Sequence, residues 1–193
     1  MAHFMVLSLP RSRSFWLSLF LSADGMQCAH DLLVQSKSLT DFETRLSLVD
    51  GSCETGAIVG WRLLRHRLPK LRLITVLRRP EEVIESIARK GYLVPKGVIE
   101  SRFSMLEDLS CEENVFSFDY EELSNPAALE SICAVAGVPW SQERCERLLG
   151  QNLQIDFAKR MSELEVAAPL LAGLNAEVAL ATAALRGSLA CLN

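Results

Sequence analysis

The chain has few of the residues that build metal or disulfide sites. Its 193 residues include three histidines, and none of them lies at the spacing that zinc ligands use. It has six cysteines but no Cys-x-x-Cys pair, and most of them stand among apolar neighbours. Reduced, buried thiols are the simplest interpretation, and they favour a cytoplasmic protein without a structural metal.

A large net charge and long apolar runs are also missing. The formal net charge is −4, so bulk charge gives no reason to expect nucleic acid as a partner. No apolar stretch is long enough to span a membrane. Residues 15–21 follow two arginines and mimic a short signal peptide, but an apolar strand precedes the charge, which is the wrong order. We therefore expect neither nucleic acid nor membrane as a partner.

The glycine-rich loop of P-loop kinases, G-x-x-x-x-G-K-[ST], is absent, but a different pattern for anion binding stands near the N-terminus. A strand-like run at 3–9 ends in a Pro-Arg-Ser-Arg-Ser turn at 10–14, and a helix-like run at 15–21 follows at once. A helix N-terminus offers unpaired N–H groups and partial positive charge, and the turn adds guanidinium and hydroxyl donors. This turn predicts a site for phosphate or a phosphate-like group.

Strand-like and helix-like segments alternate along the chain. Strands are predicted at 3–9, 26–29, 47–49, 71–77 and 115–118, and helices at 14–24, 39–46, 54–67, 80–90, 96–109, 126–136, 141–149 and most of 156–186. The best strands are apolar on both faces, which is typical of a parallel sheet covered on both sides. We predict a single domain over 1–193 with a three-layer α/β/α fold and a central, mostly parallel sheet. Its core is expected at 3–150 and a helical C-terminal region at 151–193.

Two of these strands lead into arginine. Arg11 follows the first strand and Arg78 follows the central one, and ligands of parallel α/β sheets bind beyond the carboxyl ends of the strands. Ser86 lies in the helix that comes after Arg78, so its hydroxyl and the Arg78 guanidinium are expected to converge on one phosphate. The alternative is that Arg78 merely pairs with a glutamate in the first turn of that helix.

Three segments of the chain, taken in their order along the sequence, match a known series of motifs. They are residues 9–17 (LPRSRSFWL), 73–86 (LITVLRRPEEVIES) and 115–123 (VFSFDYEEL). Together they resemble the sulfotransferase family, whose donor is 3'-phosphoadenosine 5'-phosphosulfate (PAPS). The first looks like the family's 5'-phosphosulfate loop, the second like its 3'-phosphate motif, and the third like the strand and Tyr-Glu-Asp-Leu turn that follow. The resemblance covers roughly residues 3–150.

The resemblance implies an enzyme that transfers sulfuryl from PAPS, releases 3'-phosphoadenosine 5'-phosphate (PAP) and requires no metal. Arg11 matches the loop cation that neutralises charge on the bridging oxygen as sulfuryl leaves. Ser14 matches a hydroxyl that contacts the 5'-phosphate, and backbone N–H groups of residues 12–15, from Ser12 to Phe15, complete the cradle. Arg78 and Ser86 match the positions that bind the 3'-phosphate.

The resemblance also assigns aromatic residues and exposes a departure. Trp16 matches an aromatic residue packed against adenine and Tyr120 a residue near the purine, although each is equally at home in a protein core. Arg13 stands where the family's loop usually has glycine, and it costs about 1 kcal/mol or more if that position needs a positive φ. Alternatively, Arg13 adds a further donor to the anion. Phe15 replaces a second hydroxyl residue.

The general base is the least defined part of the predicted site. Sulfuryl transfer needs an acceptor hydroxyl or amine that loses its proton as it attacks. The resemblance implies a histidine or glutamate near the end of the strand before the long helix. Asp50 is our first candidate, Glu54 the second and His30 the third. Asp50 is equally well interpreted as a turn residue or a helix N-cap.

Two alternatives to catalysis by PAPS remain open at this point, and the acceptor is unknown. One is a catalytically impaired nucleotide-binding or structural protein with the same fold. The other is a divergent P-loop nucleotide kinase, which is disfavoured because the kinase loop motif and an evident Mg²⁺-holding acid are missing.

The C-terminal region carries a seven-residue repeat at Leu171, Val178, Leu185 and Leu192. This repeat indicates either a dimer seam, and hence a homodimer, or a helix packed on its own domain.

Overall fold

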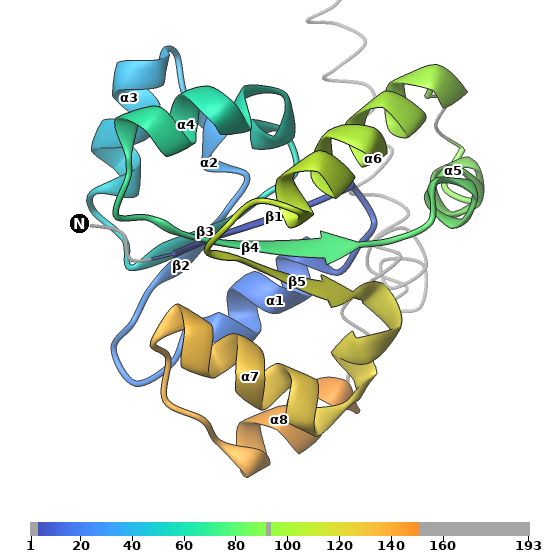
Figure 1. Ribbon diagram of the computed structural model, residues 1–193. Coiled ribbons are helices and arrows are strands. Elements are labelled where there is room, and N and C mark those ends of the chain that lie inside the picture. The colour runs from blue at the N-terminus through green and yellow to red at the C-terminus, as the bar shows by residue number, and fades with distance from the viewer. Residues whose placement is uncertain (1–3, 92–93, 151–193) are drawn as a thin grey trace, which may run out of the picture. The chain divides into compact units, whose positions relative to one another are not determined.

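The computed structural model describes residues 4–91 and 94–150. Within these residues the centre of the protein is a five-stranded sheet with the order β2-β3-β1-β4-β5 (Figure 1), and all neighbouring strands are parallel. The strands are β1 Phe4–Ser8, β2 Cys28–His30, β3 Gly51–Glu54, β4 Arg72–Leu77 and β5 Val115–Asp119. Strand β1 is therefore central, with β3 on one side and β4 on the other.

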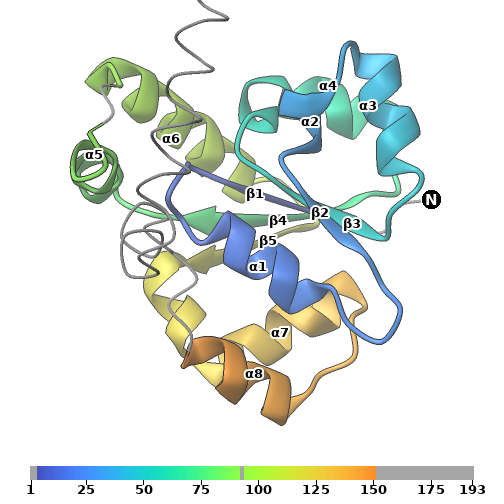
Figure 2. The ribbon, with the colours of Figure 1, turned by 180° about the vertical axis from the view of Figure 1, so that it is seen from behind.

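Helices cover both faces of the sheet (Figures 1 and 2). One face carries α1 Ser14–Leu21, α7 Pro126–Ala136 and α8 Gln142–Leu149, and the other carries α2 Leu32–Gln35, α3 Leu39–Leu46, α4 Trp61–Arg67 and α6 Lys96–Ser110. Helix α5 Pro80–Ala88 packs against α6, and two 3₁₀ helices are η1 Ala57–Gly60 and η2 Tyr120–Ser124. The three-layer α/β/α fold predicted from the sequence is confirmed. No helix in the described ranges is long and apolar enough to cross a bilayer.

The core is centred on β1, because this strand is covered by helices on both faces. All five of its residues are fully buried, as the run of apolar side chains predicts. Strand β5 lies at the edge and is more exposed, with Phe116 pointing partly into solvent. Of the cysteines in the described ranges, all five are free and four are buried.

One predicted strand is wrong. Residues 47–49 form a turn rather than a strand, because their backbone N–H groups donate back to carbonyls in the last turn of α3. The strand begins four residues later, at Gly51. The predicted helix at 54–67 begins instead with η1 at Ala57 and continues as α4, and helix α2 was not predicted. The helix predicted over 156–186 and the repeat of the dimer seam lie outside the described residues.

Candidate anion-binding site at the carboxyl edge of the sheet

The turn predicted to bind an anion joins β1 to α1, in the middle of the carboxyl edge of the sheet. Arg11 and Arg13 both have left-handed backbone conformations, with φ of 68° and 60°. Arg13 is the N-cap of α1, and its side chain does not cap the helix. The position therefore does need a positive φ, and arginine costs about 1 kcal/mol there relative to glycine. The first turn of α1 faces the loop without a side-chain cap, as at helix termini that bind anions.

Two serines place buried hydroxyls next to the loop. Ser8 ends β1 and Ser12 lies within the turn, and both residues are fully buried. Neither hydroxyl has a hydrogen-bond partner among the described residues. A buried hydroxyl without a partner costs about 1–3 kcal/mol unless something polar satisfies it. These two hydroxyls fit a loop that holds a polar ligand.

The structure brings Arg11, Arg78 and Ser86 together. Arg11 donates from Nε to the Ser86 hydroxyl at 3.4 Å, and Arg78 donates from Nη1 to the backbone carbonyl of Arg11. Arg78 also donates from Nε to a carboxylate oxygen of Glu82 at 3.4 Å. The pairing with an early glutamate, expected as an alternative, therefore coexists with the contact to the loop. The end of β4 and the helix α5 form one polar cluster with the turn after β1.

Tyr120 adds an aromatic ring to this cluster. The guanidinium carbon of Arg78 lies 4.0 Å from the centroid of the Tyr120 ring, and that of Arg13 lies 5.6 Å from it. Arg13 also donates from Nη1 to the carbonyl of Leu123 at 3.1 Å and to the hydroxyl of Ser124 at 3.2 Å. Arg13 thereby ties the anion loop to η2, so all three motifs meet at one place.

Trp16 lies on α1 and faces α8, and the guanidinium carbon of Arg13 is 5.9 Å from the centroid of its ring. Its indole Nε1 donates to the carbonyl of Leu148 at 3.0 Å, and its ring stacks on Phe20 with centroids 5.1 Å apart. The residue is 6% exposed. Phe20 therefore stacks on one face of the Trp16 ring, and the packing against α8 is that of a core residue.

His30 lies on the other side of the loop, at the carboxyl end of β2. Its Nε2 atom is 3.0 Å from the Ser14 hydroxyl and 3.5 Å from a carboxylate oxygen of Asp31. The second carboxylate oxygen of Asp31 accepts from the backbone N–H of Thr55 at 2.8 Å and from its hydroxyl at 2.9 Å. Asp31 is thus fixed by the chain that leaves β3. Both contacts are made by Nε2, which donates or accepts according to the tautomer of the ring.

Glu54 also reaches the carboxyl edge, but its carboxylate is fully buried. It accepts from the backbone N–H groups of Leu32 at 2.8 Å and Leu33 at 3.1 Å, and from the hydroxyl of Ser52. Burial raises the pKa of Glu54, although these donors oppose the rise. The arrangement holds the first turn of α2 against β3. It gives Glu54 a positioning role and no access to an acceptor molecule.

Asp50 is not brought to this edge. It precedes β3, and its carboxylate accepts from the backbone N–H of Gln27 at 2.8 Å, at the amino edge of the sheet. The sequence predicts a strand at 47–49, and Asp50 would then directly follow the carboxyl end of that strand. Because the real strand begins at Gly51, Asp50 comes before the strand and acts as a turn residue.

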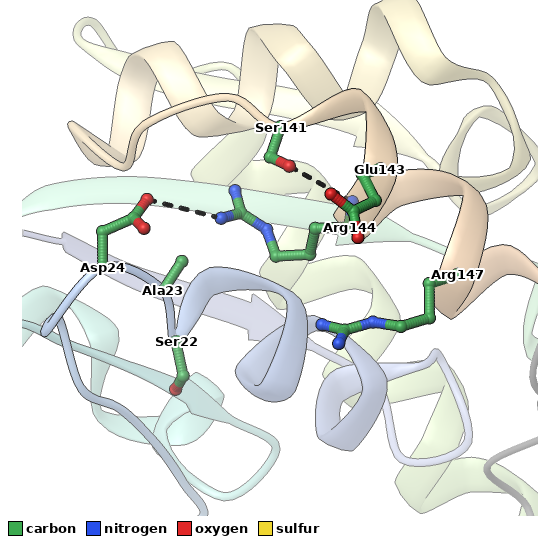
Figure 3. Close-up of a pocket in the computed structure, with 7 residues that line it drawn as sticks. All are labelled: Ser22, Ala23, Asp24, Ser141, Glu143, Arg144 and Arg147. Carbon is green, nitrogen blue, oxygen red and sulfur yellow. Dashed lines mark hydrogen bonds and ion pairs between the residues drawn. The ribbon is translucent and has the colours of Figure 1, made fainter.

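A cavity of about 250 Å³ lies at the opposite end of α1 from the anion loop (Figure 3). Its lining residues are Ser22, Ala23, Asp24, Ser141, Glu143, Arg144 and Arg147. Arg144 is buried and donates to the carbonyl of Pro139 at 2.5 Å, and its Nη1 lies 3.8 Å from a carboxylate oxygen of Asp24. Two acids and two arginines line this cavity, so it favours no sign of charge. It is not part of the candidate site.

The pair of Asp31 and Thr55 was missed by the sequence reasoning, which ranked His30 only third. A signal was present, since His30 and Asp31 directly follow the apolar strand predicted at 26–29. The rule that ligands bind beyond carboxyl ends of parallel strands, applied to this short strand, points to both residues.

Comparisons with known proteins concern the fold. No family model and no curated protein matches the chain. A mouse sulfotransferase solved in complex with PAP superposes with a TM-score of 0.56 at 13% identity, over 77% of this chain and 62% of that one. The chain thus spans less than two thirds of the length of the mouse protein.

Bacterial proteins give similar superpositions. The sulfotransferase domain of a Synechococcus olefin synthase has a TM-score of 0.56 at 16% identity, covering 79% of this chain and 78% of that one. A sugar kinase from a Janibacter species has a TM-score of 0.51 at 18% identity, covering 72% and 95%. Structural similarity at such low sequence identity shows that the fold is shared, but it does not show which reaction the protein catalyses. The chain has a sulfotransferase-like P-loop fold.

Proposed function

We propose that this protein is a sulfotransferase that moves a sulfuryl group from PAPS to a hydroxyl or amine of an acceptor. The observation that carries the proposal is the polar cluster of Arg11, Arg78 and Ser86, which joins the loop after β1 to the end of β4 and to α5. A nucleotide with phosphate groups at both its 5' and 3' positions matches two adjoining sets of donors. ADP and ATP lack the 3'-phosphate that Arg78 and Ser86 would hold.

In the proposed reaction the bond between sulfur and the bridging oxygen of the 5'-phosphosulfate breaks, and its electron pair stays on the phosphate. A new bond forms between sulfur and the acceptor oxygen or nitrogen, which gives up its proton. Arg11 and the N–H groups of the first turn of α1 stabilise the charge that develops on the leaving phosphate. The unpartnered hydroxyls of Ser8 and Ser12 are further donors within reach of the loop.

His30 is the proton acceptor in this proposal, in preference to Asp50 and Glu54. It lies beside Ser14 of the loop and is partly exposed, whereas Glu54 is fully buried and Asp50 lies at the other edge of the sheet. Asp31, held by Thr55, stabilises the imidazolium that forms. The proton moves from the attacking hydroxyl or amine to a ring nitrogen of His30.

A phosphoryl-transferring kinase is the second candidate, because a sugar kinase shares the fold. The loop of this chain lacks the Gly-Lys-[ST] end that kinases of this fold use for phosphates and Mg²⁺. That difference favours the sulfotransferase. A protein that binds the nucleotide without catalysis is the third candidate.

Thermal stabilisation by PAP, compared with ADP and with ATP–Mg²⁺, separates the candidates. A selective rise of the melting temperature with PAP, followed by transfer of labelled sulfate from PAPS, supports the proposal. Stabilisation by ATP–Mg²⁺ alone supports a kinase and refutes it. A selective response to PAP without transfer to any acceptor supports the binding protein.

A further inference from the structure

The cavity beyond the C-terminal end of α1 is built by two parts of the chain (Figure 3). Ser22, Ala23 and Asp24 follow directly on α1, and Ser141, Glu143, Arg144 and Arg147 belong to the N-cap and first two turns of α8. The anion loop lies at the other end of α1, and the 8 residues of this helix span about 12 Å. The cavity is therefore separate from the proposed nucleotide site.

Arg144 brings a buried guanidinium with an incomplete set of hydrogen bonds to the cavity. The residue is 8% exposed, and its Nε has no hydrogen-bond partner among the described residues. Its Nη2 donates to the carbonyl of Pro139, and its guanidinium carbon lies 5.2 Å from the centroid of the Phe20 ring, so the group is held in place. A buried donor without a partner is costly unless a polar group satisfies it. Arg144 therefore has hydrogen-bonding capacity left for an acceptor.

Two further groups add positive charge beside Arg144. Arg147 lies about one turn further along α8 and lines the same cavity, and it makes no ion pair or hydrogen bond with any residue that the structure describes. The cavity also borders the N-terminus of α8, where the N-cap Ser141 accepts from the backbone N–H of Arg144 at 3.2 Å. The other N–H groups of this first turn have no partner within the helix and carry partial positive charge. This side of the cavity attracts a carboxylate.

Two carboxylates on the same cavity oppose a simple anion. An oxygen of Asp24 lies 3.8 Å from Nη1 of Arg144, which is an ion pair but too long for a hydrogen bond. Glu143 lies in the first turn of α8. Neither carboxylate accepts a hydrogen bond within the described part of the chain. Both therefore have oxygens that can accept from an ammonium group.

The mixed charges and the small volume together define a class of ligand. A ligand with a single charge is attracted by one pair of side chains and repelled by the other. A ligand with both an ammonium and a carboxylate group satisfies both pairs. The cavity of about 250 Å³ is smaller than the pockets of about 300–1,000 Å³ that hold drug-sized ligands. It therefore suits a molecule much smaller than a nucleotide.

We propose that this cavity binds a small zwitterion with the chemistry of a free α-amino acid. The carboxylate pairs with Arg147 and with Nε of Arg144, and the ammonium group pairs with Asp24 and Glu143. The proposal is independent of the sulfotransferase reaction, because the cavity shares no residue with the anion loop or with the polar cluster at β4 and α5.

Three small probes separate the two charges of the ligand. L-alanine carries both charges, propionate carries only the negative one, and L-alaninamide carries only the positive one. Calorimetric titration of each probe into the full chain, without nucleotide, should show saturable binding of L-alanine and affinities at least about tenfold weaker for the other two. Absence of L-alanine binding or equal affinity for the three probes would overturn the proposal. Tighter binding of propionate than of L-alanine would also overturn it and would indicate an anion site.

Two variants of exposed residues on α8 test the pairing. Glu143→Gln and Arg147→Gln should each weaken L-alanine binding about tenfold or more. Because each variant also removes a repulsion, Glu143→Gln should bind propionate more tightly than wild type does, and Arg147→Gln should bind L-alaninamide more tightly. A general loss of folding would instead weaken all three probes. Glu146→Gln is the matched control, since Glu146 is exposed on the same helix but does not line the cavity. Unchanged L-alanine binding in both variants, or an equal loss in Glu146→Gln, would refute the proposed site.

Discussion

The Nε atom of Arg11 lies 3.4 Å from the hydroxyl oxygen of Ser86, and this contact joins two motifs that stand 75 residues apart in the sequence. Arg11 belongs to the loop between β1 and α1, and Ser86 lies on α5. The two proposed phosphate sites therefore share a boundary. A substitution in the proposed 3'-phosphate site should therefore change which nucleotide the protein prefers.

Replacement of Arg78 by alanine should abolish the preference for PAP over ADP. Charge-assisted hydrogen bonds contribute about 1.5–3 kcal/mol, so PAP affinity should fall about tenfold or more while ADP affinity changes little. Calorimetric titration of both nucleotides measures the difference. Arg62→Ala is a matched control, because Arg62 is an exposed arginine on α4. An unchanged preference for PAP in Arg78→Ala would exclude Arg78 from the 3'-phosphate site.

Arg13→Gly and Arg13→Ala should differ in stability although both remove the same contacts to η2. The backbone φ of 60° suits glycine and strains alanine, so the glycine variant should be the more stable by about 1 kcal/mol. Urea unfolding of the two variants measures this difference. Equal stabilities would mean that the loop does not hold a left-handed residue at this position.

His30→Gln should reduce kcat by about 10²-fold to 10⁴-fold, because glutamine retains a polar contact to Ser14 but accepts no proton. Stabilisation by PAP should persist in the variant. His66→Gln is the control, since His66 lies exposed in the last turn of α4. Full activity in His30→Gln would assign the proton to another group.

Glu54→Gln should change how stability depends on pH. Burial raises the pKa of Glu54 above its ordinary value of 4.5, so folding takes up a proton over the interval between the unfolded and folded pKa values. The stability that this group contributes is present below 4.5 and is lost as pH rises through the folded pKa. Wild type should therefore lose stability relative to Glu54→Gln as pH rises above 4.5 and through the folded pKa. Parallel curves from urea unfolding at each pH would show that the pKa is not raised.

The central fold could be predicted because its signals are local. Strands β1 and β4 consist mostly of apolar residues, and α7 begins at Pro126 and ends before Gly137, as the helix signals in the sequence indicate. The parallel sheet follows from strands that are apolar on both faces. The loop and Arg78 could be recognised because each follows directly on such a strand, and Ser86 because it lies in the helix that comes after Arg78.

The remainder depends on contacts that no local pattern specifies. Strand β3 is short and made of small or polar residues, so its start was placed four residues early, and Asp50 was assigned to the wrong edge of the sheet. Trp16 carries the same apolar helix signal whether it faces a ligand or α8. The burial of Glu54 depends on α2, a helix of one turn that leaves no periodic signal.

The anion loop makes two left-handed turns of the backbone with no glycine between Leu9 and Trp16. Glycine at such positions adopts a positive φ without strain but contributes no side chain. Arg11 and Arg13 adopt the same backbone conformation and each contribute a guanidinium. A sequence signature written around glycine therefore describes one of two chemical ways to build this turn. Chains that use the second way are recognised by the handedness of the backbone and by the charge that replaces the glycine.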